Sequence, residues 1–184
     1  MPTAAERLAG AATPARLALA LGAVAAAFLL NAYANLPVEQ ALRTGDCQLL
    51  DCLRPQRPEA RHAGYSAAEF REFLAAIGPL RRQALWALVA DLPLIAAITT
   101  ALLTAAGLAT RGLPLSDRNS RILILLPLAF AATDLAEDIL LAAAYSALAD
   151  PAGVLPWISA LKFGLLVASA LLSIVLGLAR AVQN

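Results

Sequence analysis

Three acidic residues, Asp134, Glu137 and Asp138, lie within five positions of one another in an otherwise apolar stretch, 121–149. The stretch is long enough to cross a bilayer, because a membrane-spanning helix needs about 20 residues at about 1.5 Å each. A charged side chain at the bilayer centre costs at least about 2.5 kcal/mol. These carboxyl groups must therefore be paired, protonated or in contact with water, and the fold has to bring partners to them.

The rest of the chain is also apolar. Hydrophobic residues make up 60% of the 184 residues, against about 45–50% in an average soluble domain. Four segments are long and apolar enough to span a membrane: 17–36, 83–106, 121–149 and 156–178. We therefore expect an all-α fold, an integral membrane four-helix bundle that forms a single transmembrane domain over residues 1–184.

Local signals set the expected ends of these segments. Thr13 is a suitable N-cap with Pro14 at the first helical position, and Pro37 is expected to end the first span. Ser116 or Asp117 is the expected start of the third helix. The first segment also fits a cleavable signal peptide, because basic residues precede a short apolar core. We favour a retained span.

Positive residues predict the orientation. They lie at the N-terminus, between the second and third spans, and at the C-terminus: Arg7, Arg16, Arg111, Arg118, Arg121 and Arg180. The positive-inside rule then places both termini in the cytoplasm and the loop 37–82 outside. The Ala- and Leu-rich composition with a single lysine is typical of GC-rich bacterial genomes, so we expect a multi-pass protein of the bacterial inner membrane.

Charge composition excludes one class of partner. The chain has 14 Lys+Arg against 13 Asp+Glu, no basic stripe and only 5% aromatic residues. No nucleic-acid partner is therefore expected. We also expect no metal site and no cofactor, because the single histidine, His62, lies in an arginine-rich loop and no phosphate-binding glycine loop is present.

The outer loop carries the two cysteines, Cys47 and Cys52. In an oxidising compartment this spacing allows a small disulfide loop, which we favour. Two free thiols are the alternative. A redox-active pair is less favoured, because the neighbouring Asp46 and Asp51 oppose thiolate formation.

The same loop contains a helix signal at 67–77. Ser66 and Glu69 fit a capping box, in which each side chain accepts a hydrogen bond from an otherwise free backbone N–H at the helix start. One face of the helix is apolar: Phe70, Phe73, Leu74 and Ile77. Such an amphipathic helix is expected in the headgroup layer or over the mouth of the bundle.

Polar side chains of the four spans fall at similar depths. Counted from the outer end of each span, the ionisable groups lie about 9 to 22 Å deep, in the outer half or near the midplane. The ionisable side chains at these depths are Asp91, Asp134, Glu137, Asp138 and Lys162, and Asn31 and Asn35 of the first span lie in the same outer half. Independent placement would not favour this coincidence, so we expect one shared outer-half site.

The four acids and one lysine of this site predict a general class of chemistry but no particular reaction. With a single cation to share, some carboxyl groups must carry a proton. A neutral acid beside an ionised one suits acid–base chemistry, and it equally suits a proton or cation site. The candidate catalytic residues are Asp134, Glu137, Asp91 and Lys162, and the candidate ligand-lining residues are Asp138, Asn31, Asn35, Tyr145 and Trp157.

Several short motifs resemble those of a group of small, uncharacterised four-span bacterial membrane proteins, whose third span reads D-L-x-E-N. The segments concerned are 64–69 (GYSAAE), 74–78 (LAAIG), 91–93 (DLP), 134–138 (DLAED) and 161–163 (LKF). Asp138 departs from the Asn of that group. The resemblance implies the four-span fold and no particular activity. A looser, fold-level likeness links the chain to sterol isomerases and sigma-2-type receptors.

The leading hypothesis is a pocket that binds or converts a lipophilic small molecule or lipid by metal-free acid–base chemistry, as an isomerase, a cyclase or an epoxide-opening hydrolase. A proton- or cation-coupled transport or binding component is the second hypothesis. The third is an accessory subunit, in which the acids are structural ion pairs and the helices dock a membrane partner or a second copy.

Overall fold

The computed structural model describes residues 4–43, 57–58, 64–111, 113 and 116–183. These residues form helices and no strands. The helices are α1 (Ala4–Ala11), α2 (Pro14–Leu42), α4 (Ala67–Ala76), the short 3₁₀ turn η2 (Gly78–Leu80), α5 (Arg81–Ala109), α6 (Asp117–Tyr145) and α7 (Leu155–Gln183). Four of them have 29 residues each, which corresponds to about 43 Å of helix.

The first long helix begins as expected and ends later than expected. The Thr13 hydroxyl accepts a hydrogen bond from the Arg16 N–H, with Pro14 at the first helical position. The prediction that Pro37 ends the helix is wrong, because α2 continues through Pro37 to Leu42. Proline removes only one helical hydrogen bond, and the fully buried Val38 packs into the core directly after it. Tertiary packing outweighs the proline here.

The third long helix is displaced towards the N-terminus relative to the expected 121–149. It begins at its N-cap Ser116, whose side chain accepts from the Asn119 N–H. It ends at Tyr145, where Leu148 N–H donates to the Ala143 carbonyl and Ala147 adopts a φ of 56°. This is a Schellman ending, with alanine in the left-handed position that glycine usually occupies.

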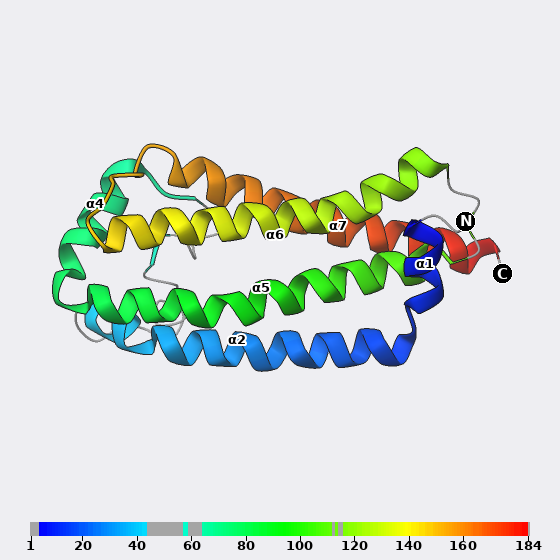
Figure 1. Ribbon diagram of the computed structural model, residues 1–184, viewed down its shortest axis with the longest axis horizontal. Coiled ribbons are helices and arrows are strands. Elements are labelled where there is room, and N and C mark those ends of the chain that lie inside the picture. The colour runs from blue at the N-terminus through cyan, green and yellow to red at the C-terminus, as the bar shows by residue number, and fades with distance from the viewer. Residues whose placement is uncertain (1–3, 44–56, 59–63, 112, 114–115, 184) are drawn as a thin grey trace.

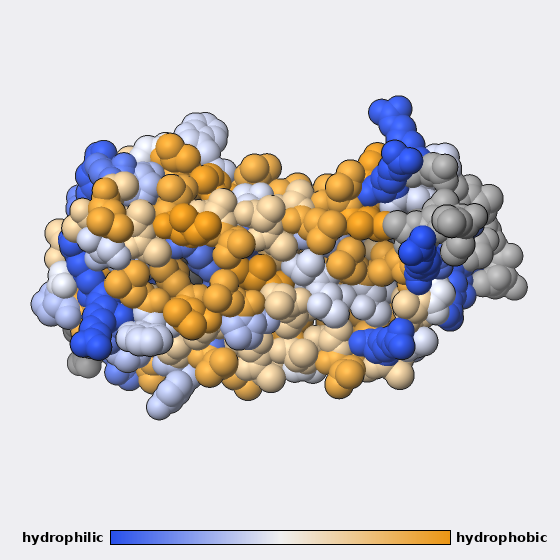
Figure 2. Space-filling model, viewed as in Figure 1, coloured by the Kyte–Doolittle hydropathy of each residue, from blue (hydrophilic) through white to orange (hydrophobic). Residues whose placement is uncertain are grey.

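Three helices are long and apolar enough to cross a membrane within the described ranges: Pro14–Leu42, Gly78–Ala109 and Leu155–Val182. α6 has the same length, but the acidic triplet interrupts it and it is not among the three. Large apolar side chains remain exposed along the helices, for example Leu19, Leu29 and Leu178. Figure 2 shows the result, a broad hydrophobic middle with hydrophilic residues gathered at both ends.

The long helices lie side by side (Figure 1). α2 packs on α5, α6 packs on α5 and α7, and α5 also contacts α7. No comparable contact joins α2 to α7. α5 is therefore the central helix of the arrangement, and α2 is joined to the other long helices mainly through α5.

α4 closes one end of the helices (Figure 1). Its N-terminus has the reciprocal bonds of a capping box between Ser66 and Glu69. Phe70, Phe73 and Ile77 are buried against the ends of α2, α5, α6 and α7 in the main apolar core. The helix thus covers this end of the long helices with its apolar face.

α1 and both termini lie at the opposite end (Figure 1). α1 packs against α5 at Gly107, where an added Cβ would lie 2.9 Å from both the Ala12 Cβ and the Leu8 carbonyl oxygen. Arg111 donates to the Ala9 carbonyl, and Arg180 donates to the Leu108 carbonyl. Only glycine permits this approach of α1 to α5.

Candidate functional site

Lys162 of α7 joins two of the three acids on α6. Its Nζ lies 3.0 Å from Asp134 Oδ1 and also donates a hydrogen bond to Glu137 Oε2. Asp134 and Glu137 are three residues apart, so they share one face of α6. The side chains of Lys162, Asp134 and Glu137 are only 12%, 8% and 1% exposed. This ion-paired group is buried between α6 and α7.

Two hydroxyl groups extend this cluster towards the end that α4 covers. The Ser159 hydroxyl hydrogen-bonds to Glu137 Oε1, and Tyr65 Oη lies 3.0 Å from Ser159 Oγ. Neither residue was a sequence candidate. The sequence does place Ser159 on the same small-polar helical face as Lys162, three residues before it. Tyr65 comes from the segment before α4, and no helical period connects it to the site. We call Tyr65, Asp134, Glu137, Ser159 and Lys162 the Lys162 cluster.

Asp91 of α5 is held from the other side by α2. Asn31 Nδ2 donates to Asp91 Oδ1 at 2.8 Å, and Asn35 Nδ2 donates to the Asn31 carbonyl at 2.9 Å. Asp91 is also close enough to Asp134 and Lys162 to interact with them electrostatically. The amides expected to line the site therefore position an acid at its edge.

Asp138, the third acid of α6, is buried but is not bonded to Lys162. Its side chain is only 6% exposed, and its Oδ2 has no hydrogen-bond partner among the described residues. It interacts electrostatically with the other three acids and with Lys162. The structure thus brings together all five ionisable residues expected from the sequence, with Lys162 bonded to two of the acids and Asp138 left without such a bond.

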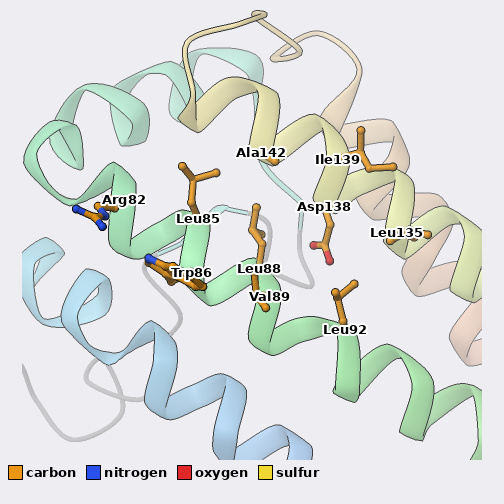
Figure 3. A pocket seen from close by; sticks show the side chains of 10 residues that line it. All are labelled: Arg82, Leu85, Trp86, Leu88, Val89, Leu92, Leu135, Asp138, Ile139 and Ala142. Carbon is orange, nitrogen blue, oxygen red and sulfur yellow. The ribbon is translucent and has the colours of Figure 1, made fainter.

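Asp138 lines a groove between α5 and α6, with a volume of about 530 Å³. Figure 3 shows its carboxyl group directed from α6 towards α5. The remaining lining is apolar apart from Arg82. The α5–α6 groove is defined by Arg82, Leu85, Trp86, Leu88, Val89, Leu92, Leu135, Asp138, Ile139 and Ala142. Along α5 it extends from Arg82 to Leu92, or about 15 Å of helix.

The groove opens on the apolar side surface of the molecule. Trp86, Val89, Leu92, Leu135 and Ile139 are all exposed large hydrophobic residues. In Figure 2, a hydrophilic spot is visible within the hydrophobic face between α6 and α5. A buried acid is therefore reached across an apolar surface, whereas Asp134 and Glu137 do not line the groove.

No protein-family model, curated protein or solved structure matches this chain. Within the described ranges, no group of three His, Cys, Asp or Glu side chains is arranged to hold a metal ion.

The other sequence candidates lie away from the groove or outside the described residues. Tyr145 is buried in the core under α4, with its ring 6.3 Å from that of Phe73. Trp157 is 78% exposed at the start of α7. Cys47 and Cys52, with the predicted disulfide, lie outside the described residues.

Proposed function

We propose that this chain is a four-span protein of the bacterial inner membrane that binds a lipophilic small molecule in the α5–α6 groove. The apolar exterior and the three apolar helices support the membrane location. α6 would be the fourth span, because its acids are buried among α5 and α7 rather than exposed to lipid. The arginines at the end that carries α1 support cytoplasmic termini, and the motif resemblance to small four-span proteins agrees.

The observation that carries the proposal is the unpartnered carboxyl group of Asp138 at the wall of an apolar groove. A buried polar group without a partner costs about 1–3 kcal/mol, so a ligand that supplies the partner gains this energy on binding. The groove faces the side of the molecule, so the ligand would enter from the lipid phase. Ligand pockets with apolar walls and one or two oriented polar groups are the common type.

Acid–base chemistry is the reaction class that this site would support. Asp138 would be the group in contact with the ligand, because it alone of the four acids lines the groove. Asp91, Asp134, Glu137 and Lys162 would set the charge around it. Proton transfer of this kind serves isomerisation, cyclisation or epoxide opening. The hydrogen-bonded hydroxyls of Tyr65 and Ser159 would connect Glu137 to the end under α4.

A second candidate function is structural. Lys162, Asp134 and Glu137 bond to one another, and none of them lines the groove. In this interpretation the cluster holds α6 against α7, and the chain is an accessory subunit of a membrane assembly. The two functions differ in whether anything occupies the groove.

The test is to identify the molecules that co-purify with the protein. Ala142 lines the groove, so Ala142→Phe should fill it, while Ala25→Phe adds the same bulk at an exposed position of α2. Solvent extracts of the two variants and of the wild type would be compared by mass spectrometry. We expect a lipophilic compound that is retained by the wild type and by Ala25→Phe and lost from Ala142→Phe.

Asp138→Asn separates binding from conversion. The amide has nearly the same shape, so the variant should fold and should retain less of the compound. If Asp138 is catalytic, membranes containing this variant should accumulate the unconverted form. An Ala142→Phe extract identical to that of the wild type would refute the proposal and favour the structural role.

A further inference from the structure

A second groove lies at the opposite end of the molecule, between α2, α5 and α7, with a volume of about 820 Å³. It follows from the packing, because α2 rests on α5 without a comparable contact to α7. Its walls are the first turns of α2 and the last turns of α5 and α7. Residues that line this α2–α7 groove include Leu17, Leu21, Ala105, Ser173, Gly177 and Arg180.

Small and aliphatic side chains make up most of this groove, and a basic group closes one end. Arg180 lines it and is half-buried, and its Nη1 donates to the Leu108 carbonyl at 2.8 Å. A guanidinium has five N–H donors, so this one bond leaves others for a ligand. Arg16 lies in the first turn of α2. Within the described ranges, neither arginine has a carboxylate partner.

An apolar groove with a guanidinium at one end that has no carboxylate partner is complementary to an anionic phospholipid. We propose that the α2–α7 groove binds one such lipid, with an acyl chain between α2 and α7 and its phosphate at Arg180. Basic pockets between transmembrane helices on the cytoplasmic side bind anionic headgroups in this way. The proposal rests on the proposed membrane location of the chain, and it does not depend on the ligand of the α5–α6 groove.

The lipid also has a structural consequence. It would fill the space that the helices leave open and so join α2 to α7, which contact each other little in the protein alone. Anionic lipid should therefore raise the unfolding temperature as well as bind. A zwitterionic lipid with the same chains offers the same apolar contact. The negative charge of its phosphate, however, is offset by the positive group of the same headgroup, so it should stabilise the protein less.

The test compares phosphatidylglycerol with phosphatidylcholine of identical acyl chains, added to the purified full-length protein in detergent. Native mass spectrometry counts the retained lipid, and a thermal scan reports stabilisation. One arginine near the headgroup corresponds to about a fivefold higher affinity for the anionic lipid than for the zwitterionic one. We expect the wild type to retain phosphatidylglycerol at least about fivefold better, and Arg180→Gln to lose about that factor. Arg118→Gln, an exposed arginine at the start of α6, should lose nothing.

A second pair of variants tests the acyl-chain part. Gly177 lines the groove, and Gly22 lies outside it. A Cβ added at either glycine meets no atom within 4 Å. Gly177→Leu should therefore block the lipid without disturbing the fold, while Gly22→Leu should leave binding unchanged.

Four results would overturn the proposal. Equal retention of the two lipids would exclude headgroup recognition. An equal loss in Arg118→Gln and Arg180→Gln would assign the preference to general surface charge. Unchanged lipid retention in Gly177→Leu, or a protein dimer that this variant dissociates, would place the lipid elsewhere or identify a second copy as the occupant. None of these results bears on the α5–α6 groove.

Discussion

Replacing Lys162 by methionine is the most informative perturbation of the buried cluster. Methionine keeps much of the apolar stem and removes the cation. Asp134 and Glu137 then lose the ammonium group that both contact, although their side chains remain only 8% and 1% exposed. Breaking a buried ion pair by removing one partner typically costs about 3–5 kcal/mol. We expect a loss of this size in the free energy of unfolding.

An exposed ion pair of the same chain provides the matched control. Arg71 and Asp150 are joined at 3.0 Å, but their side chains are 59% and 57% exposed. Exposed pairs contribute about 0–1 kcal/mol. Arg71→Gln should therefore reduce stability far less than Lys162→Met, even though the Arg71–Asp150 distance equals that between Lys162 and Asp134.

The assay is denaturant unfolding in a fixed detergent, followed by circular dichroism. The triple variant Lys162→Met, Asp134→Asn, Glu137→Gln removes all charge from the cluster and should regain most of the lost stability, because a neutral replacement leaves no stranded charge. A Lys162→Met variant that loses no more than Arg71→Gln would refute the burial argument. A triple variant as unstable as the single one would show that packing, rather than charge, holds α6 against α7.

Three further predictions concern the ends of the helices. Gly107→Ala should weaken the docking of α1 by about 1–3 kcal/mol, because the new methyl overlaps the α1 backbone; hydrogen exchange of α1 amides measures this. Ala147→Gly should raise the unfolding temperature, since it relieves about 1 kcal/mol of left-handed strain. The backbone N–H of Ala152 and the Arg71 side chain lower the pKa of Asp150 below its usual 3.8. This carboxylate therefore adds stability above pH 3.8 that disappears as the pH falls through its lowered pKa, and unfolding of Asp150→Asn should lack that part of the acid dependence.

The sequence predicts well what depends on depth and local chemistry. The N-caps Thr13 and Ser116 and the capping box at Ser66 act as expected, because each requires only neighbouring residues. Counting residues from the outer ends placed Asp91 and Lys162 near the acids of α6, and the structure has them in electrostatic contact.

The sequence could not predict which acid faces which neighbour. Asp134, Glu137 and Asp138 all lie on about one side of α6, but adjacent positions differ by about 100° around a helix. Only the rotation of α6 against α5 and α7 decides that Glu137 meets Lys162 while Asp138 lines a groove. That rotation is set by packing along the whole helix. Tyr65 could not be found for a related reason, since its contact with α7 depends on the path of the chain before α4.

The order of synthesis gives the Lys162 cluster a further consequence. Glu137 precedes Lys162 by 25 residues, so the acids of α6 leave the ribosome before their counterion does. In the proposed topology, α6 would enter the bilayer with three carboxyl groups, each costing at least about 2.5 kcal/mol. The insertion machinery would have to hold α6 in a hydrated or protein-lined environment until α7 follows. In this proposed topology, insertion and folding would be one event for this half of the chain, and α7 would deliver the charge that allows α6 to stay in the membrane.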